Sequence, residues 1–455
     1  MKQINHKLLQ EIIEDCPNRL QTKNSLVSDE NCLIAPTLVY ILKEVQKELA
    51  FQSNGRTLKN SEMDELIYQI SERLGYSINS QEKDEIFTYI EKEHQPFGVL
   101  QDLVKDVGIN DIIVSAYNRI VIQKGRRNYK TGLCFASPED YEAYVEKLLI
   151  KASSSYSTKI PIADGMIGDS ARIHAVHKTI CDEGPYLTIR LNRYLEIKND
   201  DLISLGLAPR EVFDYLTAVV QSGQTLMIAG EVGTGKTTLA RAVASEIPSE
   251  ESILVIEDTP EIKLVHPNVR YIRTRNANLE SAGKISPSEC IRAGMRMAMN
   301  RIIFGEIRDA EAAESFIDVC ASGHPGISTV HARNAQDVIN RLELFLGRAQ
   351  KGAAKNVLTQ QVGNAIQIVV HISICKQTGK RRIIEVKEIG SFADNVLRTK
   401  TIFEYVLEKE TPCWLVKNCV SSFKQEIEEL ERPYNLNKIG NKIFLEQDLR
   451  FKEVA

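Results

Sequence analysis

The chain of 455 residues is too long for one hydrophobic core of ordinary size, so we expect two or three domains. Its composition, 43% hydrophobic and 26% charged residues, is typical of a soluble globular protein. The formal net charge of −4 argues against a protein that coats nucleic acid. No apolar run approaches the ~18 residues that a membrane span needs, so any association with a membrane is expected to run through partners.

The nine cysteines are scattered along the chain, and none forms a C-x-x-C pair. An odd number of isolated cysteines predicts reduced thiols in a cytoplasmic protein, and disfavours a disulfide frame or a zinc module. The first 16 residues are amphipathic and acidic, without the apolar core or the small-residue cleavage site of a secretory leader.

Residues 1–90 alternate helical stripes with polar breaks and are expected to form a helical extension. The clearest stripe, residues 61–74, begins with a capping-box pattern at Ser61 and Asp64 and ends at Gly75. We interpret its apolar face as internal packing, and a docking surface is the alternative. That face consists of Met63, Leu66, Ile67, Ile70 and Leu74.

Residues 91–193 change to a mixed α/β pattern and are expected to form a second domain. Ser137 and Pro138 predict the start of a helix, with serine as the cap and proline in the first turn. Short β-branched and apolar runs predict strands, and the last two of them carry an arginine each. The predicted strands are Ile109–Val114, Arg119–Ile122, Ala171–Val176 and Tyr186–Arg190.

A phosphate-binding loop of the pattern G-x-x-x-x-G-K-[ST] follows the apolar run Leu226–Ala229. The run predicts a buried strand, and residues 237–247 predict a helix with Leu239, Val243 and Ile247 on one face. This context favours a nucleotide site over a plain glycine turn between a strand and a helix. The nucleotide-binding residues are expected to be Gly230, Gly233, Thr234, Gly235, Lys236, Thr237 and Thr238.

The chemistry of the loop explains its residues. We expect positive φ at its three glycines, which lets successive N–H groups point inward at a helix N-terminus and hold an anion. Lys236 is expected on the β- and γ-phosphates of ATP, and the Thr237 hydroxyl is expected to ligate Mg²⁺.

Strand candidates around this loop alternate with helical stretches, which is typical of a doubly wound α/β domain over residues 211–350. Residues 194–210, which contain Gly206 and Pro209, are expected to be a linker. The strand candidates are Leu226–Ala229, Ile253–Ile256, Ile302–Gly305 and Gly326–His331.

Beyond residue 350 we expect an appendage of helices and a hairpin that extends to residue 455. Ile366–Ile374 and Ile383–Ile389 predict a hairpin with a basic turn over residues 376–382. Residues 421–432 are acidic and predict a solvated helix.

Hydrolysis of a bound nucleotide requires carboxylates, and open α/β sheets place such groups after their strands. Glu257, Asp258 and Glu261 follow one apolar strand, and Glu306 follows another. Glu306 is the best candidate for orienting the attacking water, and Asp258 is a candidate for holding Mg²⁺. The alternative is that acids at strand ends only solubilise the protein, which becomes less attractive with a phosphate loop upstream.

His331 ends the predicted strand Gly326–His331. Its imidazole could donate a hydrogen bond to the γ-phosphate and report the loss of that group, although an ordinary surface histidine shows the same pattern. No second histidine or cysteine stands at ligand spacing, so a zinc site is not expected.

These motifs, in this order, resemble the Walker A, aspartate-box, Walker B and histidine-box series of the type II/type IV secretion and pilus-assembly ATPases. The resemblance is closest to the CpaF/TadA branch, which powers tight-adherence pili, and next to the conjugation and type IV secretion ATPases. It extends over roughly residues 95–405, including the Gly379-Lys-Arg-Arg382 hairpin. Two features qualify the resemblance: the first departs from the family pattern, and the second favours the CpaF/TadA branch. Ala298-Met-Asn-Arg301 stands where members usually have Arg-Pro-Asp-Arg, and the tetracysteine zinc element of many pilus-extension ATPases is absent.

The resemblance implies a RecA-like P-loop NTPase domain that binds ATP and Mg²⁺. It also implies that Arg172 and Arg190 supply positive charge to the phosphates, while Glu306, Glu257, Glu261 and His331 serve catalysis. Family members work as homohexameric rings on an inner-membrane platform protein, which places this chain in the cytoplasm at the inner face of the membrane. Nucleic acid is not an expected partner.

Three rival functions remain open at this point. A conjugation or type IV secretion ATPase shares every motor motif. A nucleic-acid translocase on the same core would require basic grooves interleaved with aromatic residues, which the acidic balance and the single Trp414 disfavour. A scaffold that binds ATP without hydrolysing it is disfavoured by Glu306.

Overall fold

The computed structural model describes residues 33–52, 60–125, 127–168, 171–193, 196–275, 283–375, 379–393, 396–408, 411–440 and 442–445. The chain divides into two compact units, Met1–Arg193 and Tyr194–Ala455, each described here by itself. The amphipathic stretch over residues 1–16 and part of the predicted basic turn, residues 376–378, lie outside the described residues. No helix in the described ranges has both the length and the apolar character needed to cross a membrane.

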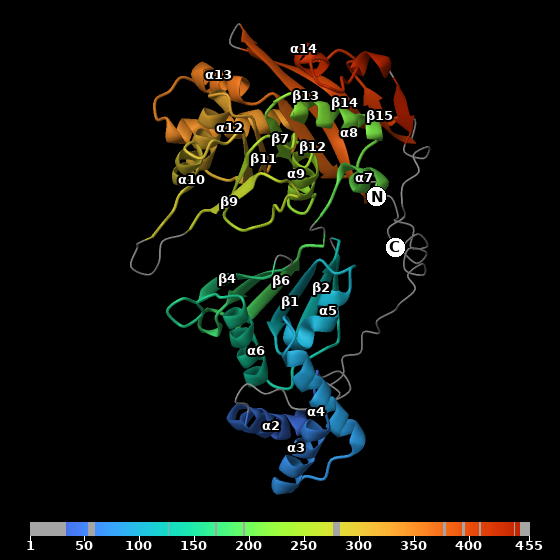
Figure 1. The fold of residues 1–455 in the computed structure, drawn as a ribbon, viewed down its shortest axis with the longest axis vertical. Coiled ribbons are helices and arrows are strands. Elements are labelled where there is room, and N and C mark those ends of the chain that lie inside the picture. The colour runs from blue at the N-terminus through green and yellow to red at the C-terminus, as the bar shows by residue number, and fades with distance from the viewer. Residues whose placement is uncertain are drawn as a thin grey trace, which may run out of the picture. The chain divides into compact units, whose positions relative to one another are not determined.

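The first unit begins with helices that pack into its own core (Figure 1). Leu66, Ile67 and Ile70 of α3 are buried there, which confirms internal packing of the predicted stripe. The helix begins at Asn60, so the prediction of a cap at Ser61 is wrong by at least one residue. The elements are η2 (Pro36–Leu38), α2 (Val39–Gln52), α3 (Asn60–Arg73), α4 (Ser80–Glu93), η3 (Gly98–Leu100) and α5 (Gln101–Lys105).

A six-stranded antiparallel sheet completes the first unit, in the order β3-β2-β1-β6-β5-β4. The predicted helix starts where expected, because the Ser137 hydroxyl accepts the Asp140 N–H at the N-terminus of α6. The Tyr141 hydroxyl ties α6 to the sheet by donating to the Val114 carbonyl at 3.1 Å. The elements are β1 (Asp111–Ala116), β2 (Arg119–Lys124), β3 (Arg127–Lys130), α6 (Pro138–Lys151), β4 (Ile162–Ile167), β5 (Ala171–Val176), η4 (Lys178–Ile180) and β6 (Tyr186–Leu191).

Alternation along β5 separates the two faces of this sheet. Ala171, Ile173 and Ala175 are buried in the core, whereas Arg172 and His174 between them are partly exposed on the other face. A period of two along the strand therefore gives one packed face and one polar face.

The second unit is built on a ten-stranded sheet in the order β16-β15-β14-β13-β12-β7-β11-β10-β8-β9. From β12 to β9, each pair of adjacent strands in this order is parallel. Five predicted strands are confirmed with small differences at their ends. They are β7 (Leu226–Ala229), β8 (Ile253–Glu257), β10 (Arg301–Ile307), β11 (Gly326–Val330) and β12 (Ile368–Ile374), whereas β9 (Val269–Arg273) was not predicted.

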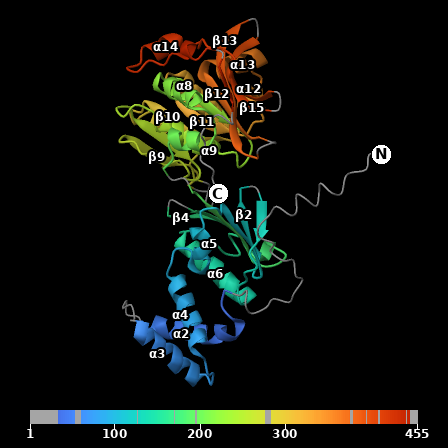
Figure 2. The same cartoon turned by 90° about the vertical axis from the view of Figure 1, so that its right-hand side faces the viewer.

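Side chains of these parallel strands enter two different cores. Ile228 of β7 packs in one core with α8 and α9, and its neighbours Met227 and Ala229 pack in the other with α11 and α12. Helices therefore cover both faces of the sheet, as Figure 2 shows for α8 and α12. The helices are α7 (Asn199–Ser204), α8 (Arg210–Gln221), α9 (Lys236–Ala244), α10 (Pro287–Gly294), α11 (Ala310–Ala321), α12 (Ala335–Ala349) and α13 (Lys355–Ala365).

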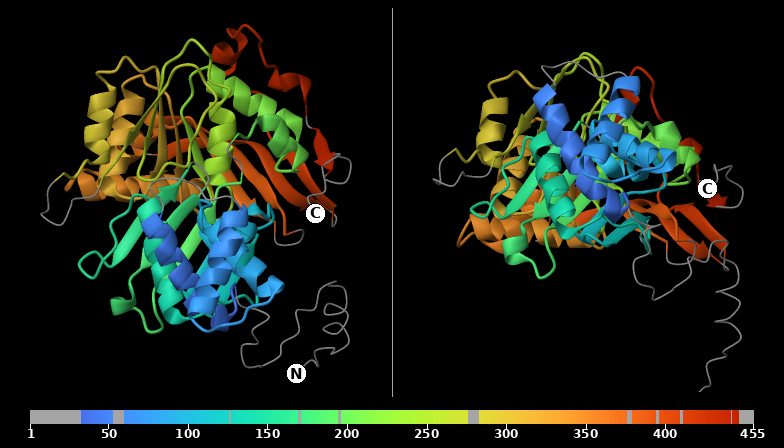
Figure 3. Two further views of the ribbon diagram at one scale, coloured as in Figure 1. Left: turned by 60° about the horizontal axis from the view of Figure 1, so that its bottom comes forward. Right: turned by 90° about the horizontal axis from the view of Figure 1, so that it is seen from below.

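The predicted hairpin near residue 380 is confirmed by the antiparallel pairing of β12 with β13. It continues the sheet through β14, β15 and β16, which were not predicted from the sequence, and Figure 3 shows this extension in orange and red. The elements are β13 (Arg381–Ala393), β14 (Val396–Glu408), β15 (Thr411–Val416), α14 (Lys424–Glu428), η5 (Leu436–Lys438) and β16 (Ile443–Leu445).

The helix predicted over residues 421–432 is much shorter than expected, because α14 covers only Lys424–Glu428. The preceding residues are held by a buried carboxylate instead. Ser421 donates its hydroxyl to Glu388 at 2.5 Å, and Ser422 donates its N–H to the same side chain at 2.8 Å. Ile427 is 2% exposed, but most of the other residues from 422 to 432 are exposed, so the predicted solvation of this segment is largely confirmed.

Candidate nucleotide-binding site

The phosphate loop connects β7 to α9, and two of its three glycines have positive φ. The φ angles are +75° at Gly233 and +97° at Gly235. The expectation of positive φ at Gly230 is wrong, because this glycine serves close packing. A Cβ there would lie 2.4 Å from the Ile372 carbonyl oxygen of β12 and 2.7 Å from the Thr234 hydroxyl. The absence of a side chain at Gly230 therefore lets the beginning of the loop pack directly against β12.

Lys236 begins α9 and is turned into the protein, with 7% of its surface exposed. Its Nζ donates to the Glu231 carbonyl at 3.1 Å and lies 3.3 Å from Nδ1 of His331. Burial lowers the pKa of Lys236. Thr237 and Thr238 follow in the first turn of α9 and are half-buried. A lysine, a helix N-terminus and a threonine hydroxyl thus occupy one short stretch, which is the donor set that suits a magnesium-bound phosphate chain.

Glu306, on β10, is held by an arginine that follows the same strand. Nε and Nη2 of Arg308 both lie 2.7 Å from Oε2 of Glu306. The remaining Nη1 donates to Oδ2 of Asp258 at 2.7 Å. The structure thereby brings Glu306 and Asp258, which are 48 positions apart in the sequence, onto one guanidinium group.

His331 lies between Lys236 and Glu306. Its Nε2 is 2.7 Å from Oε1 of Glu306, which is buried and makes no hydrogen bond of good geometry within the described residues. Burial and the nearby charge of Lys236 lower the pKa of His331, so the neutral ring is favoured.

Glu257 is the last residue of β8, and Glu261 lies in the turn after it, but neither shares the contacts of Asp258. Oε1 of Glu257 accepts the backbone N–H groups of Glu261 and Ile262 at 3.1 and 2.9 Å. Burial raises the pKa of Glu257 to about 8. The Glu261 carbonyl accepts Nη1 of Arg241 at 3.1 Å, which connects the turn to α9. These contacts shape the turn that presents Asp258.

The two predicted arginines of the first unit face each other across neighbouring strands. Arg172 of β5 is paired in register with Arg190 of β6. Nη2 of Arg172 lies 3.3 Å from Oδ1 of Asp164, and Nε of Arg190 donates to Asp111 at 2.9 Å. The polar face of the sheet therefore carries two arginines, each beside an aspartate, with 30% of Arg172 and 57% of Arg190 side-chain surface exposed.

Two residues at the site were not singled out from the sequence. Arg308 stands two positions after Glu306, and this spacing on a strand was the available signal. Arg381 begins β13 and donates from Nε to the Gly233 carbonyl at 3.1 Å. It lies within the basic turn that was predicted, but its contact with the phosphate loop depends on the pairing of β12 with β7.

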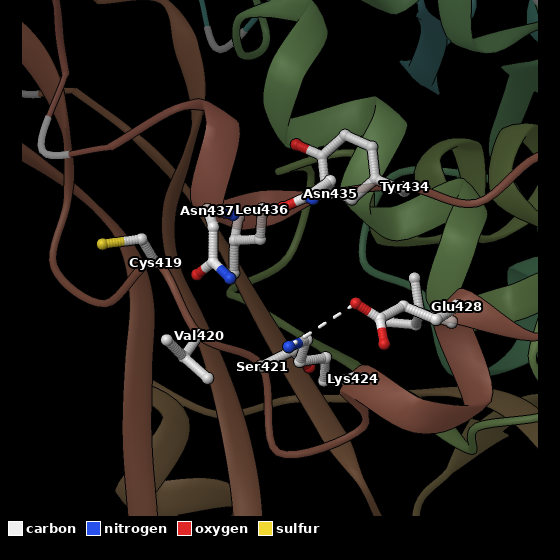
Figure 4. Close-up of a pocket in the computed structure, with 10 residues that line it drawn as sticks. Cys419, Val420, Ser421, Lys424, Glu428, Tyr434, Asn435, Leu436 and Asn437 are labelled. Carbon is white, nitrogen blue, oxygen red and sulfur yellow. Dashed lines mark hydrogen bonds and ion pairs between the residues drawn. The ribbon is translucent and has the colours of Figure 1, made fainter.

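A small hollow in the C-terminal segment is separate from the phosphate loop (Figure 4). Its charged lining residues, Lys424 and Glu428, are joined by an ion pair of 3.6 Å. It contains none of the predicted site residues. The remaining lining residues are Cys419, Val420, Ser421, Ile427, Tyr434, Asn435, Leu436 and Asn437.

Comparisons with known proteins agree with the motif series. Residues 99–454 match the family described as type II/IV secretion system protein. An uncharacterised protein of Methanocaldococcus jannaschii is 29% identical over 347 residues, 75% of this chain and 61% of that protein. The chain thus spans less than two thirds of that relative.

A putative conjugal transfer protein of Mycobacterium tuberculosis is 27% identical over 295 residues, 64% of this chain and 83% of that protein. Among solved structures, the VirB11 ATPase of the Brucella suis type IV secretion system, in complex with sulphate, is 24% identical. That match covers 66% of this chain and 96% of that one, with a TM-score of 0.35.

The second unit has an α/β fold, with the phosphate loop after a central parallel strand and helices on both faces of the sheet. The family match runs from residue 99 to residue 454 and so covers about half of the first unit and nearly all of the second. The chain therefore belongs to the type II/IV secretion system protein family.

Proposed function

We propose that this chain is the ATP-hydrolysing motor of a secretion or pilus-assembly machine. The observation that carries the proposal is the cluster of Lys236, His331, Glu306, Arg308 and Asp258, linked by contacts of 2.7 to 3.3 Å. A phosphate-binding lysine beside a partly unpartnered carboxylate is the arrangement that phosphoryl transfer to water requires.

In this proposal, the backbone N–H groups from Gly230 to Thr238 and the ammonium group of Lys236 bind the ATP phosphates. Mg²⁺, held by the Thr237 hydroxyl and Asp258, would neutralise charge on those phosphates. Oε1 of Glu306 orients the attacking water, because Arg308 occupies Oε2 and leaves Oε1 on the side of His331, 2.7 Å from Nε2 of that ring. Glu257 and Glu261 support the turn that carries Asp258.

His331 serves as the γ-phosphate sensor in this proposal. Its neutral ring contacts both Lys236 and Glu306, so a phosphate that draws Lys236 away changes the position of the imidazole. Arg172 and Arg190 add positive charge to the transferring phosphate, since their guanidinium groups are partly exposed on the polar face of the first unit.

We further propose that the chain works as a homohexamer of the CpaF/TadA type, in the cytoplasm at the inner face of the membrane, on a platform protein. The resemblance of the motifs and of the Gly379-Lys-Arg-Arg382 hairpin supports this branch. A conjugation or type IV secretion ATPase is the second candidate, favoured by the similarity to a putative conjugal transfer protein.

The test measures Mg²⁺-dependent phosphate release from ATP over a series of protein concentrations, with mass determined by light scattering in parallel. We expect turnover to rise as a species near six times 51.2 kDa forms, and to ignore added single-stranded DNA. Turnover by a monomer, or strong stimulation by DNA, would instead identify a nucleic-acid translocase. No turnover at any concentration would identify an ATP-binding scaffold.

A further inference from the structure

Arg308 is the feature of the site whose role none of the motifs explains. It follows the last residue of β10, Ile307, and precedes Asp309, whose side chain accepts the Ala312 N–H and caps α11. The backbone on both sides of Arg308 is therefore fixed by a strand end and a helix cap. The guanidinium group is thus carried at a defined place between the ends of β8 and β10.

All three of its contacts are made to carboxylates of the site. Nε and Nη2 converge on Oε2 of Glu306, and Nη1 donates to Asp258, each at 2.7 Å. The planar fork of an arginine can make both contacts at once, whereas the ammonium group of a lysine is a single point charge.

The pair of Arg308 with Asp258 contributes little to the stability of the fold. Arg308 and Asp258 have 54% and 56% of their side-chain surface exposed, and solvent screens ion pairs of this exposure strongly. The main consequence is geometric. Of the two oxygens of Glu306, Oε2 is held by Arg308, while Oε1 is buried and faces Nε2 of His331 at 2.7 Å without a well-aligned hydrogen bond in the described part of the chain.

We propose that Arg308 is a positioning residue that ties Oε2 of Glu306 to Asp258 and so leaves Oε1 aimed at the attacking water. This inference rests on the proposed ATPase function and adds to it a residue that acts through Glu306. Arg308 need not touch the nucleotide. It fixes the direction of the Glu306 carboxylate relative to Asp258. Glu306 is the group proposed to orient the water, and Asp258 is the group proposed to hold the metal.

The experiment is a double-mutant cycle of Arg308→Gln and Glu306→Gln, with steady-state phosphate release and binding of a fluorescent ADP analogue measured for each protein. In the wild-type background, Arg308→Gln is expected to lower kcat by roughly 10- to 100-fold, because a small misplacement of a catalytic group has costs of that order. Binding of the ADP analogue is expected to change by less than about threefold, because ground-state binding is kept.

In the Glu306→Gln background, Arg308→Gln is expected to change kcat by less than about twofold, since residues that act as a unit are not additive. Arg308→Lys is expected to recover part of the rate, and it serves as the second variant if the glutamine form does not fold. The matched control is Arg210→Gln, which breaks an exposed pair of 2.8 Å with Asp200 and is expected to leave kcat unchanged.

Three results would overturn the inference. They are a wild-type kcat in Arg308→Gln, an equal loss in both Glu306 backgrounds, or a loss of ADP binding that matches the loss of rate. A wild-type protein that releases no phosphate would overturn the proposed function itself, and is recognised before any variant is compared.

Discussion

The two sheets of this protein carry their functional side chains in different ways. In the second unit, Lys236, Asp258, Glu306 and His331 come from separate segments and meet where parallel strands end. In the first unit, Arg172 and Arg190 lie on the face of an antiparallel sheet, opposite each other. Parallel strands direct their carboxyl ends to one edge, so loops can build a site there, whereas antiparallel strands offer a face.

The contrast extends to how the charges are compensated. At the strand ends, one guanidinium serves two carboxylates and a buried lysine contacts a histidine. On the sheet face, each arginine has its own acid, Asp164 or Asp111, and keeps much of its surface exposed. The first arrangement is a connected network of charged groups, whereas the second consists of two separate ion pairs whose arginines remain partly exposed.

The largest effect is expected from Lys236→Ala at the strand-end site. Removal of the buried ammonium group takes away the point charge on the phosphates, so kcat/KM for ATP should fall by at least about 10³-fold. Phosphate release and nucleotide binding measure it. Lys355→Ala, at a lysine with 84% of its side-chain surface exposed on α13, is the control and should behave as wild type. Equal rates for Lys236→Ala and wild type would contradict the proposal that this loop binds the phosphates of ATP.

On the sheet face, Arg190→Ala and Arg172→Ala are each expected to lower kcat by about 10- to 10³-fold. This loss is smaller than that expected for a single arginine finger, because two arginines share the role. Steady-state kinetics would show it. The control is Arg119→Ala, which breaks another arginine pair of the same sheet, 2.9 Å from Glu183. If all three variants have the same rate, the sheet face does not serve the nucleotide.

Within the phosphate loop, Gly230→Ala and Gly233→Ala separate close packing from backbone conformation. Gly230→Ala places a methyl group 2.4 Å from the Ile372 carbonyl oxygen, so about 1–3 kcal/mol of stability and the shape of the loop should be lost. Gly233→Ala meets no atom within 4 Å and should cost about 1 kcal/mol for its positive φ. Denaturant unfolding with ADP binding would compare them, and tighter binding by the Gly230 variant would contradict this view.

The smallest effect concerns pH. His371 on β12 is 7% exposed, and burial lowers its pKa below the ordinary value of 6.5. His371 therefore binds a proton more readily in the unfolded chain than in the folded protein. The free energy of unfolding should fall as the pH drops below about 6.5 and be regained above it. His371→Gln should flatten that part of the stability curve by a fraction of a kcal/mol up to ~1 kcal/mol. An unchanged slope in thermal melts between pH 5 and 7 would exclude His371 as its origin.

The sequence predicted the local features of the site and missed those that depend on register. Leu226–Ala229, the loop and the helix after it follow from an apolar run, glycines and a 3.6-residue period, and all three were found. The role of Gly230 was misjudged because it depends on Ile372, which pairing brings to the loop from 142 positions away. The contact of His331 with Lys236 likewise requires the order of β7 and β11 in the sheet.

The C-terminal part was the least predictable from the sequence. Residues 421–432 have the charge pattern of a solvated helix, but Glu388 binds Ser421 and Ser422, and α14 begins only at Lys424. The strand β14 mixes charged and apolar residues without regular alternation, so its sequence gives a weak strand signal. Tertiary contacts therefore decided both outcomes against local propensity.

The most direct test of the account is single-turnover phosphate release by wild type and Glu306→Gln at matched occupancy of ATP. Because only the oriented carboxylate differs, we predict that the variant binds ATP as tightly as wild type and releases phosphate about 10²- to 10³-fold more slowly. Equal rates of release in the two proteins would contradict the claim that this network at the strand ends performs the hydrolysis.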